Sequence, residues 1–230
     1  MRIVFVRHGK PDYATDSLLD LGKKQAQTVA NRLLRENVSE IYSSTMGRAL
    51  ETAEPFSKLS GLQINGLDFA REIEWGSDSD KELLEGGNPW FILPRFVREG
   101  KSVVIDNLTT DPDFSENTRL IDSQSRVISG FDDWLAELGY ARDGFYYRAL
   151  RADECKTVVL FCHGGSSTVM ISHLLNLPFL QLCATYRPYF TSVSIIKMSA
   201  AEGELAIPKI ELLSDDAHVV KDNSDAKIMR

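Results

Sequence analysis

Two short apolar segments, each followed directly by His-Gly, constrain the fold of this 230-residue chain more than any other feature. Residues 3–6 lead into Arg7-His8-Gly9, and Thr157–Cys162 leads into His163-Gly164-Gly165. Continuous runs rich in β-branched residues are typical of buried strands in a parallel or mixed sheet. Ligands of open α/β sheets bind beyond the carboxyl ends of such strands. If the two strands are parallel neighbours, His8 and His163 meet at that edge.

The rest of the chain predicts helices and strands in alternation. Apolar residues at helical spacing predict helices at 20–34, 46–59 and 123–138, the first of them capped by Asp20. A short strand is expected at 39–43. After the second His-Gly segment we expect a helix at 167–175 and strands near 191–198 and 205–212. The alternation predicts an α/β fold, a three-layer α/β/α sandwich with a mostly parallel sheet.

The middle of the chain follows neither period. Residues 77–116 contain glycines, prolines and interleaved aromatic side chains without clean spacing. We interpret about 77–125 as a cap inserted over one end of the sheet, within a single domain of residues 1–230 that ends in a polar tail at about 214–230. Long loops in compact domains are often functional, so a lid role is expected. The alternative is an ordinary packed subdomain without contact to substrate.

Composition narrows the partners and the compartment. The net charge of −7 argues against nucleic acid or an anionic membrane as the main partner, although a site can be locally basic. Three cysteines at irregular spacing resemble neither a disulfide framework nor a zinc site. The first apolar run is too short for a signal peptide or a membrane span. We expect a cytoplasmic protein with unoxidised thiols, whose oligomeric state the sequence leaves open.

The residues around the two histidines are suited to an anion. An arginine directly after a buried strand, such as Arg7, is costly unless an anion pairs with it. The glycine after each histidine lets the backbone approach a bound anion closely. The peptide N–H groups at the start of the helix that follows His163 would add positive potential.

At this point the chain resembles a known family, the histidine phosphatase superfamily of phosphoglycerate mutase-like proteins. Arg7-His8-Gly9 resembles the family signature. Residues 42–53, which include Arg48, resemble its second motif, in which Ser-Ser is followed by Arg-Ala and then Thr-Ala. Residues 71–76 resemble its acidic motif, 161–165 its C-terminal histidine motif, and 21–26 a common segment. Order and rough spacing agree over nearly the whole chain, except at 77–116.

The resemblance implies a phosphoglycerate mutase-like fold and a role for each site residue. His8 is the implied nucleophile and forms a phosphohistidine, which requires a neutral imidazole. Glu72 is the implied acid, which protonates the leaving oxygen and then activates water. Arg7, Arg48 and His163 hold the phosphoryl group. These basic residues supply the charge, so no metal or other cofactor is expected, and the implied substrate is a small phosphorylated metabolite.

Several assignments within this pattern stay open. Glu74 lies two residues from Glu72 and competes with it as the acid. Tyr13 replaces the family's aromatic residue. Many members carry an amide side chain where this chain has Ala14, so one phosphate ligand is missing or is supplied by another residue, such as Lys10. Gly164 is expected to contact the phosphate. The other two histidines, His173 and His218, are not expected to be catalytic.

The chemistry also has alternatives. The leading interpretation is a phosphatase. The first alternative is a phosphoglycerate mutase-type phosphotransferase, which the acidic stretch at 77–82 suits poorly because such enzymes carry basic cap segments. The second is a non-catalytic phosphate-binding module on the same fold. Candidates to meet a second anionic group of the substrate are Arg95, Arg98, Arg119 and Arg126, and candidates for an apolar wall are Trp75, Trp90 and Phe91.

Overall fold

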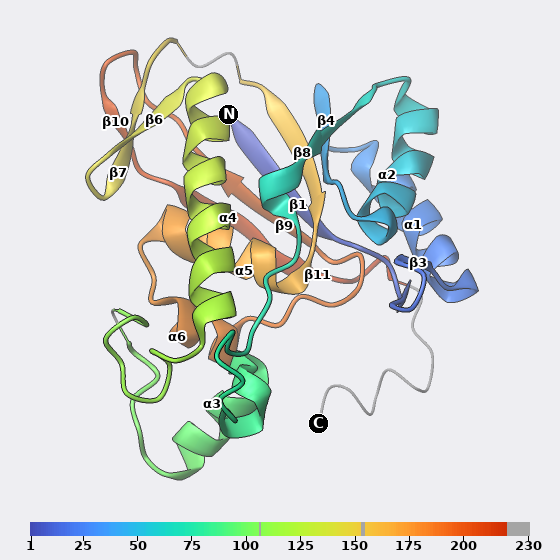
Figure 1. Cartoon of the computed structure of the whole chain (residues 1–230). Coiled ribbons are helices and arrows are strands. Elements are labelled where there is room, and N and C mark those ends of the chain that lie inside the picture. Colours follow the sequence, from blue (N-terminus) through green and yellow to red (C-terminus); the bar gives the residue numbers. More distant parts are fainter. Residues whose placement is uncertain (106, 153–154, 220–230) are drawn as a thin grey trace.

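A central sheet with helices on both faces forms the body of the protein in the computed structural model, which describes residues 1–105, 107–152 and 155–219 (Figure 1). Within these residues the sheet has six strands in the order β11-β9-β1-β8-β4-β5. The pairs β1–β8, β8–β4 and β4–β5 are parallel, whereas β9 and β11 are antiparallel to their neighbours. The strands are β1 (Arg2–Arg7), β4 (Glu40–Ser44), β5 (Ile64–Leu67), β8 (Thr157–Cys162), β9 (Val193–Lys197) and β11 (Lys209–Asp215).

The two strands that end in His-Gly are hydrogen-bonded parallel neighbours. Arg7 of β1 is in register with Cys162 of β8, so His8 and His163 follow at the same edge. Every residue of β8 is buried, because helices cover both faces of the sheet. The predicted meeting of the two histidines at the carboxyl edge is therefore confirmed.

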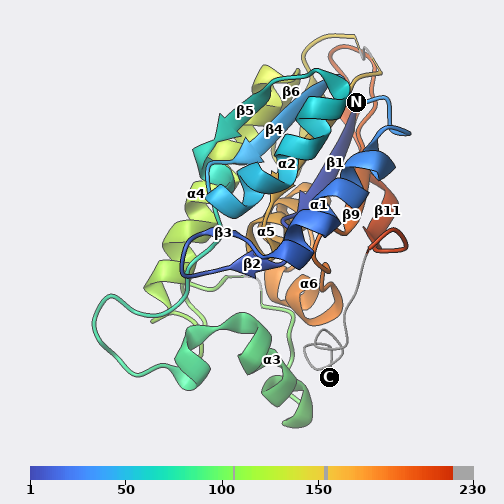
Figure 2. The ribbon, with the colours of Figure 1, turned by 90° about the vertical axis from the view of Figure 1, so that its right-hand side faces the viewer.

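Successive side chains of β1 serve two separate cores. Ile3 and Phe5 pack into the core beneath α4 and α5, whereas Val4 and Val6 pack into the core beneath α1 and α2. This alternation follows from the two-residue period of a strand. Figure 2 shows α1 and α2 in front of the sheet, with α4 and α5 behind it. The three-layer sandwich with a mostly parallel sheet is confirmed. The covering helices are α1 (Asp20–Leu33), α2 (Gly47–Ser60), α4 (Thr118–Glu137) and α5 (Gly164–Leu175).

Smaller elements surround this body. A two-stranded and a three-stranded sheet lie outside the central one. Their strands are β2 (Pro11–Asp12) and β3 (Ser17–Leu18), and β10 (Leu205–Ala206), β7 (Tyr146–Ala149) and β6 (Tyr140–Asp143). The remaining helices are α3 (Pro89–Arg98), α6 (Phe179–Thr185) and the short 3-10 turns η1 (Asp68–Ala70) and η2 (Leu84–Gly87).

Several predicted boundaries were wrong. The single strand expected at 205–212 is two strands in different sheets, because Pro208 between them has no N–H to continue a ladder. Asp20 is the first helical residue of α1 and not its cap; the cap position is Leu19, which makes no side-chain hydrogen bond to the helix. The helix expected from residue 167 already begins at Gly164, directly after His163. The helix expected from residue 123 begins at Thr118, inside the expected cap.

The proposed cap contains a helix that periodicity missed. Its start has local causes: Asn88 accepts the Trp90 N–H at 3.0 Å through Oδ1, and Pro89 occupies the first turn. In Figure 1 this helix, α3, lies below the sheet, and it contacts α6. The expected polar tail at 214–230 begins inside β11, which runs to Asp215, and residues 220–230 lie outside the described part of the chain.

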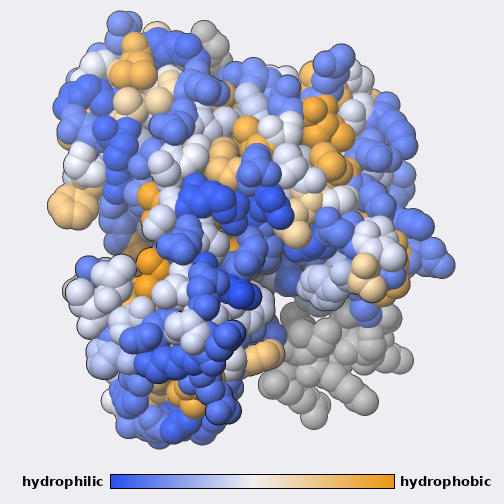
Figure 3. Space-filling model, viewed as in Figure 1, coloured by the Kyte–Doolittle hydropathy of each residue, from blue (hydrophilic) through white to orange (hydrophobic). Residues whose placement is uncertain are grey.

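Hydrophilic side chains dominate the face shown in Figure 3, where the hydrophobic patches are small and separate. Among the described residues, no helix is both long and apolar enough to cross a membrane.

Candidate active site

His8 and His163 lie side by side at the carboxyl edge of the sheet. Their ring centroids are 5.1 Å apart, and 1% and 0% of the two residues is exposed. The His8 N–H donates to the Cys162 carbonyl at 2.9 Å, which continues the β1–β8 ladder by one residue. The pairing of the two strands therefore fixes the backbone beneath both imidazoles.

The His8 ring is held in one tautomer. Its Nδ1 lies 2.7 Å from the Gly9 carbonyl oxygen, which can only accept, so Nδ1 carries the proton. The opposite nitrogen, Nε2, then keeps its lone pair. Burial, and after it the positive charge of Arg7, hold the pKa of His8 well below its ordinary value of 6.5. The imidazole is neutral near pH 7, as a nucleophile must be.

His163 is held through the neighbouring strand. Its Nε2 lies 2.8 Å from Ser44 Oγ, at the end of β4, and the same hydroxyl accepts the Met46 N–H at 3.3 Å. Burial, with His8 and Arg48 as further causes, keeps the pKa of His163 well below its ordinary value. Ser44 is thus positioned to orient the second imidazole.

Arg48 brings a buried guanidinium group to the site, and Arg7 brings a partly buried one. Arg7 Nη1 donates to the Pro188 carbonyl at 2.7 Å, and its Cζ lies 4.3 Å from the centre of the Phe190 ring. Arg48 is 5% exposed, and its Nη1 pairs with Asp16 Oδ1. Within the described part of the chain, the buried Nε atoms of both arginines have no hydrogen-bond partner. Burial lowers the pKa of Arg7.

Asp16 is a site residue that the sequence did not indicate. Its Oδ2 accepts the Gly47 N–H at 2.7 Å while Oδ1 pairs with Arg48, so it connects the β2–β3 hairpin to the first turn of α2. Asp16 itself adopts a left-handed backbone with φ of 50°. Aspartate adopts this left-handed conformation more often than most residues, so the backbone angle by itself would not have identified Asp16 as a partner of Arg48.

Glu72, and not Glu74, lies at the site. Glu72 Oε1 accepts the N–H groups of Ser166 at 2.8 Å and Ile73 at 3.0 Å, and Oε2 accepts that of Gly165 at 3.2 Å. A Cβ atom at residue 165 would lie 2.6 Å from Glu72 Oε1, so only glycine fits there. Glu74 is exposed, and its N–H donates to Ser123 Oγ on α4. The structure therefore brings one of the two competing carboxylates to the start of α5.

A pocket of about 220 Å³ opens beside these residues. It brings together Arg7, Glu72 and Gly164 from the predicted set, and Trp75, Trp90 and Phe91 from the expected apolar wall. The cap segment therefore contributes to the same pocket as Arg7 and Gly164 at the sheet edge. Its other lining residues are Tyr13, Asn88, Gly165, Arg187, Pro188, Tyr189 and Phe190.

The segment before β3 differs from expectation. Lys10 is not among the residues that line the pocket; its N–H donates to Gln25 Oε1 at 2.8 Å, and its carbonyl packs against Gly22 of α1. Ala14 is exposed, and its N–H donates to Asp12 Oδ1. Tyr13 does reach the pocket, with its ring 5.5 Å from Arg48 Cζ.

The four arginines suggested for a second anionic group have other positions. Arg95 pairs with Glu99 and Arg119 with Asp78 on the surface. Arg126 donates to the carbonyls of Asp68, Phe69 and Glu72, so it supports the acidic segment from behind. Arg98 is exposed on α3 and does not line the pocket. The arginine that does line it, Arg187, follows α6 in a loop with no local sequence signal.

The C-terminal segment also reaches this edge of the sheet. Thr191 has a φ of 59°, which is rare for a β-branched residue, and its N–H lies 3.0 Å from the Arg7 carbonyl and 3.3 Å from that of His8. His218 Nε2 donates to the Thr191 carbonyl at 2.9 Å. His218 thus supports the strained residue behind His8 and does not line the pocket.

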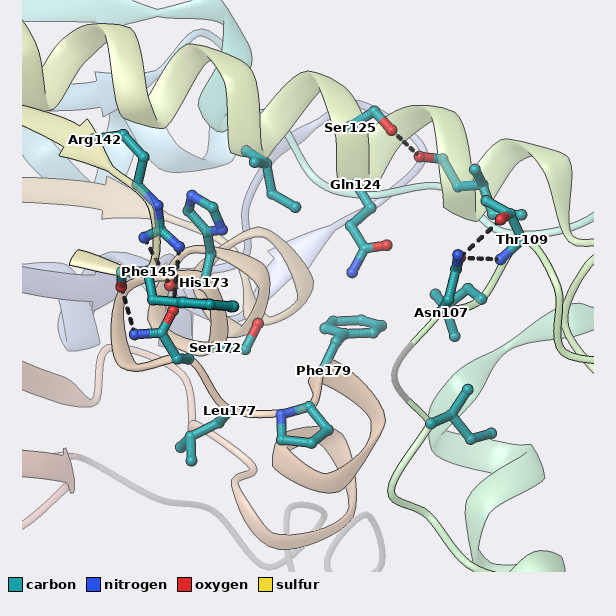
Figure 4. A pocket seen from close by; sticks show the side chains of 16 residues that line it. Asn107, Thr109, Gln124, Ser125, Arg142, Phe145, Ser172, His173, Leu177 and Phe179 are labelled. Atoms are coloured by element: carbon teal, nitrogen blue, oxygen red, sulfur yellow. Dashed lines mark hydrogen bonds between the residues drawn. The ribbon is translucent and has the colours of Figure 1, made fainter. Parts of the chain in front are cut away.

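A larger cavity, of about 550 Å³, lies elsewhere, beside the C-terminal end of α5 (Figure 4). Its polar groups are used for structure. Arg142 donates to the His173 carbonyl and to Asn176 Oδ1, and His173 Nε2 lies 2.9 Å from Asp132 Oδ1. The non-catalytic role expected for His173 agrees with this network, and no predicted site residue lines the cavity.

Over the described residues, no group of three or more His, Cys, Asp or Glu side chains could hold a metal ion. Cys162 and Cys183 are buried thiols whose pKa burial raises. Neither observation bears on which groups take part in a reaction at His8.

The comparisons with known proteins agree with this geometry. Residues 3–90 match the sequence model of the histidine phosphatase superfamily (branch 1). A protein of Schizosaccharomyces pombe named as a probable phosphatase is 27% identical over 187 residues, which cover 76% of this chain and 74% of that protein.

Solved structures with the same fold cover nearly the whole chain. A mycobacterial glucosyl-3-phosphoglycerate phosphatase in complex with inorganic phosphate superposes with a TM-score of 0.63 at 24% identity, over 95% of this chain and 99% of that one. A phosphoserine phosphatase variant from Entamoeba histolytica in complex with phosphoserine gives 0.64 at 19% identity, over 95% and 99%. At these identities the superpositions show the shared fold.

Proposed function

We propose that the chain is a histidine phosphatase, which hydrolyses the phosphomonoester of a small metabolite through a phosphohistidine on His8; the match of residues 3–90 to the superfamily model and the similarity to a probable phosphatase support this. One observation carries the proposal. Buried N–H groups of Arg7 and Arg48 without a partner among the described residues lie around a neutral imidazole with a free Nε2. Buried donors are nearly always satisfied, and a phosphoryl group supplies the acceptors that these guanidinium groups need.

In the first step, His8 Nε2 attacks phosphorus. The N–P bond forms as the bond from phosphorus to the ester oxygen breaks, and Glu72, in its protonated form, gives its proton to the leaving oxygen. Glu72 Oε2 is the suitable oxygen, since it accepts one backbone N–H at 3.2 Å whereas Oε1 accepts two shorter ones. Arg7, Arg48 and His163 stabilise the charge on the equatorial oxygens.

In the second step, water attacks the phosphohistidine. Glu72, now a carboxylate, takes a proton from the water, the new P–O bond forms, and the N–P bond breaks to release phosphate and neutral His8. The backbone N–H groups at the start of α5 stabilise Glu72 as an anion between the steps. Glu72 thus gives up a proton in the first step and regains one in the second, so the cycle needs no other acid or base.

The phosphatase is favoured over the mutase-type alternative by the acidic stretch at 77–82. Two of its charges are engaged with the cap, Asp78 with Arg119 and Lys81 with Glu116, and the pocket wall from this region is aromatic, not basic. A mutase would need added cations there to hold a doubly phosphorylated intermediate.

The substrate class is proposed from chemistry and relatives together. The related mycobacterial enzyme was solved with inorganic phosphate and the Entamoeba enzyme with phosphoserine. A small phosphorylated metabolite fits a pocket of about 220 Å³. That the reaction needs no metal, and that the protein is cytoplasmic, stay predictions.

A trapping experiment tests the mechanism. Wild type mixed with a 32P-labelled phosphomonoester and quenched in base should carry an acid-labile phosphohistidine, and it should hydrolyse 4-nitrophenyl phosphate. His8→Ala should lose both the label and hydrolysis. His163→Ala, a matched change in the adjacent imidazole, should still form the label on His8, more slowly. Equal hydrolysis rates in wild type and His8→Ala would exclude the mechanism and leave the binding-module alternative or another nucleophile.

A further inference from the structure

Arg187 brings to the pocket beside His8 a positive charge that the hydrolytic cycle does not use; His8 itself is not among the residues that line this pocket. The residue is exposed and lines the pocket together with Arg7, Glu72 and Gly164. Within the described residues, its side chain takes part in none of the ion pairs and hydrogen bonds of the protein, whereas Arg95, Arg119 and Arg126 all have partners. Arg187 is therefore a cation that is available to a ligand.

The backbone on either side of Arg187 is fixed. Tyr186 before it is buried, and its hydroxyl lies 3.0 Å from Ser194 Oγ of β9. Pro188 after it is buried, and its carbonyl accepts Arg7 Nη1 at 2.7 Å. The Arg187 side chain thus starts one residue from the contact that orients a phosphate-binding arginine. Its guanidinium group can sample positions within the reach of a small molecule whose phosphate is held at His8.

The charges of the pocket leave one cation in excess. Its lining contains two positive charges, Arg7 and Arg187, and one negative charge, Glu72. Arg7 and the neighbouring Arg48 are the arginines beside His8, where the phosphoryl group is proposed to bind. A second anionic group on the ligand would balance Arg187, and a guanidinium group binds a carboxylate or a phosphate through paired N–H donors.

The walls between the two ends of the pocket are aromatic. Trp75 and Trp90 stack edge to face with ring centroids 6.4 Å apart, and Phe91 lies on the same lining. Such surfaces suit the uncharged middle of a ligand. Ligand recognition therefore divides into a phosphate end at His8, an apolar middle and an anionic end at Arg187.

We propose that Arg187 selects phosphomonoesters whose organic part carries a second anionic group, a carboxylate or a further phosphate. This inference rests on the proposed phosphatase activity, and it assigns a specificity role to a residue outside the catalytic set. Arg187 acts on binding of the substrate's far end and leaves the chemistry at phosphorus unchanged.

The first test compares 4-carboxyphenyl phosphate with 4-carbamoylphenyl phosphate, which have nearly the same shape and differ in one charge. Wild type should prefer the carboxylate by about 10-fold in kcat/KM, since a hydrogen bond to a charged group is worth about one such factor at an exposed site. Arg187→Gln should bring the two substrates to within about 2-fold, mainly through KM. Its kcat/KM for the neutral amide should stay near that of wild type.

Matched variants isolate the charge from the fold. Arg98→Gln removes another exposed arginine that does not line the pocket, and it should keep the wild-type preference. Arg187→Glu should disfavour the carboxylate substrate and favour 4-(aminomethyl)phenyl phosphate. The wild-type preference should also shrink as salt is raised from 0.05 to about 0.5 M, because screening weakens exposed charge pairs.

A second comparison separates the two sources of anionic charge. Glycerol 3-phosphate is the reference without a second anionic group. In 3-phosphoglycerate the second anionic group is a carboxylate, and in propane-1,3-diol bisphosphate it is a phosphate. A preference for 3-phosphoglycerate that Arg187→Gln removes assigns a carboxylate, and the same result with the bisphosphate assigns a phosphate.

The outcomes distinguish this inference from the proposed function. If wild type hydrolyses none of these compounds or 4-nitrophenyl phosphate, the phosphatase proposal fails. If it hydrolyses both members of the first pair equally well, only the role of Arg187 is overturned. The role is likewise overturned if Arg187→Gln slows both members by the same factor, because that points to a general effect on phosphate binding.

Discussion

At the residue scale, the site depends on two imidazoles that burial keeps neutral. Burial is the main reason that the pKa of His8 and of His163 lies well below 6.5, and the nearby arginines lower both further. The same arginines that would hold a phosphate therefore help to keep its attacker uncharged.

The neutral histidines predict a loss of stability in mild acid. In the unfolded chain each imidazole takes up a proton as the pH falls through about 6.5, whereas in the folded protein it does not until a much lower pH. The unfolded state then binds more protons, so the free energy of unfolding should fall by about 1.4 kcal/mol per pH unit for each of the two residues below pH 6.5. Above that pH their contribution is complete.

Denaturant titrations between pH 7.5 and 5.5 measure this slope. His8→Asn should reduce the loss of stability over this whole range by about 1.4 kcal/mol relative to wild type, because the unfolded imidazole titrates at the middle of the range. The window lies above the titration of Asp132, Glu36 and Glu40, whose pKa values are lowered in the folded protein and whose stabilising effect is lost at more acidic pH. An unchanged slope in His8→Asn would contradict a neutral buried His8.

The identity of the acid gives a second prediction at this scale. Glu72→Gln should slow hydrolysis of an alkyl phosphate by about 100-fold or more, because a poor leaving group needs the proton. It should slow 4-nitrophenyl phosphate less, since that leaving group departs as an anion. Glu74→Gln, on the exposed side of the same segment, is the matched control and should behave like wild type. Reversed effects of the two variants would assign Glu74 as the acid.

At the scale of elements, close packing between backbones positions the loop after β1. Gly22 lies in α1, and a Cβ atom there would come within 2.2 Å of the Lys10 carbonyl oxygen. Gly9 packs against the same glycine, where its own Cβ would lie 2.6 Å from the Gly22 carbonyl oxygen. The contact between helix and loop thus requires glycine on both sides, next to His8.

Substitution of Gly22 tests that contact. In an open helix Gly→Ala stabilises by about 1 kcal/mol, but here the added methyl group has no space. Gly22→Ala should instead destabilise by about 1–3 kcal/mol, the usual cost of overpacking, and it should lower kcat/KM as the loop shifts. Asn31→Ala, an exposed position on the same helix, is the control and should leave stability and activity nearly unchanged. If Gly22→Ala stabilised the protein instead, the loop after β1 would have moved to make room, and the contact would not require glycine.

At the scale of the whole molecule, the site is shared between the sheet edge and the cap. The end of β1 and the start of α5 supply Arg7 and Gly164, whereas the first turn of α3 and its cap residue supply Trp90, Phe91 and Asn88. The part of the proposed cap that touches the pocket is therefore its first half. Under the proposed function, phosphate would bind at the sheet edge and the organic group at the cap.

The cap's contribution can be measured at an exposed position. Phe91 is 59% exposed, so Phe91→Ala should leave the melting temperature unchanged. The KM for 4-nitrophenyl phosphate should rise about 5-fold, because an aromatic contact is worth about 1 kcal/mol, while inhibition by inorganic phosphate stays the same. Val97→Ala, 63% exposed on the same helix and outside the pocket lining, should have no effect. Equal effects of the two variants would contradict a cap that contacts substrate.

The features that the sequence alone predicted are those with a local cause. Buried strands and covering helices follow from apolar spacings of two and 3.6 residues, and His8 and His163 follow such strands directly. Because parallel strands present their carboxyl ends at one edge, a local pattern was enough to place both histidines in one site. The strand predicted at 205–212 was wrong because its apolar residues continue across Pro208, where the structure changes from one sheet to another.

The tertiary structure alone decided the contacts between segments that lie far apart in the chain. Asp16 reaches Arg48, Glu72 reaches the start of α5 while Glu74 turns to α4, and Arg187 joins the pocket from a loop. No helical or strand periodicity connects the residues in these contacts. Loops bring them together, and the positions of the loops depend on how they pack against the rest of the fold. The sequence therefore determined the fold and the meeting of His8 with His163, and the packing of loops against the sheet edge decided which carboxylate and which arginine line the pocket beside them.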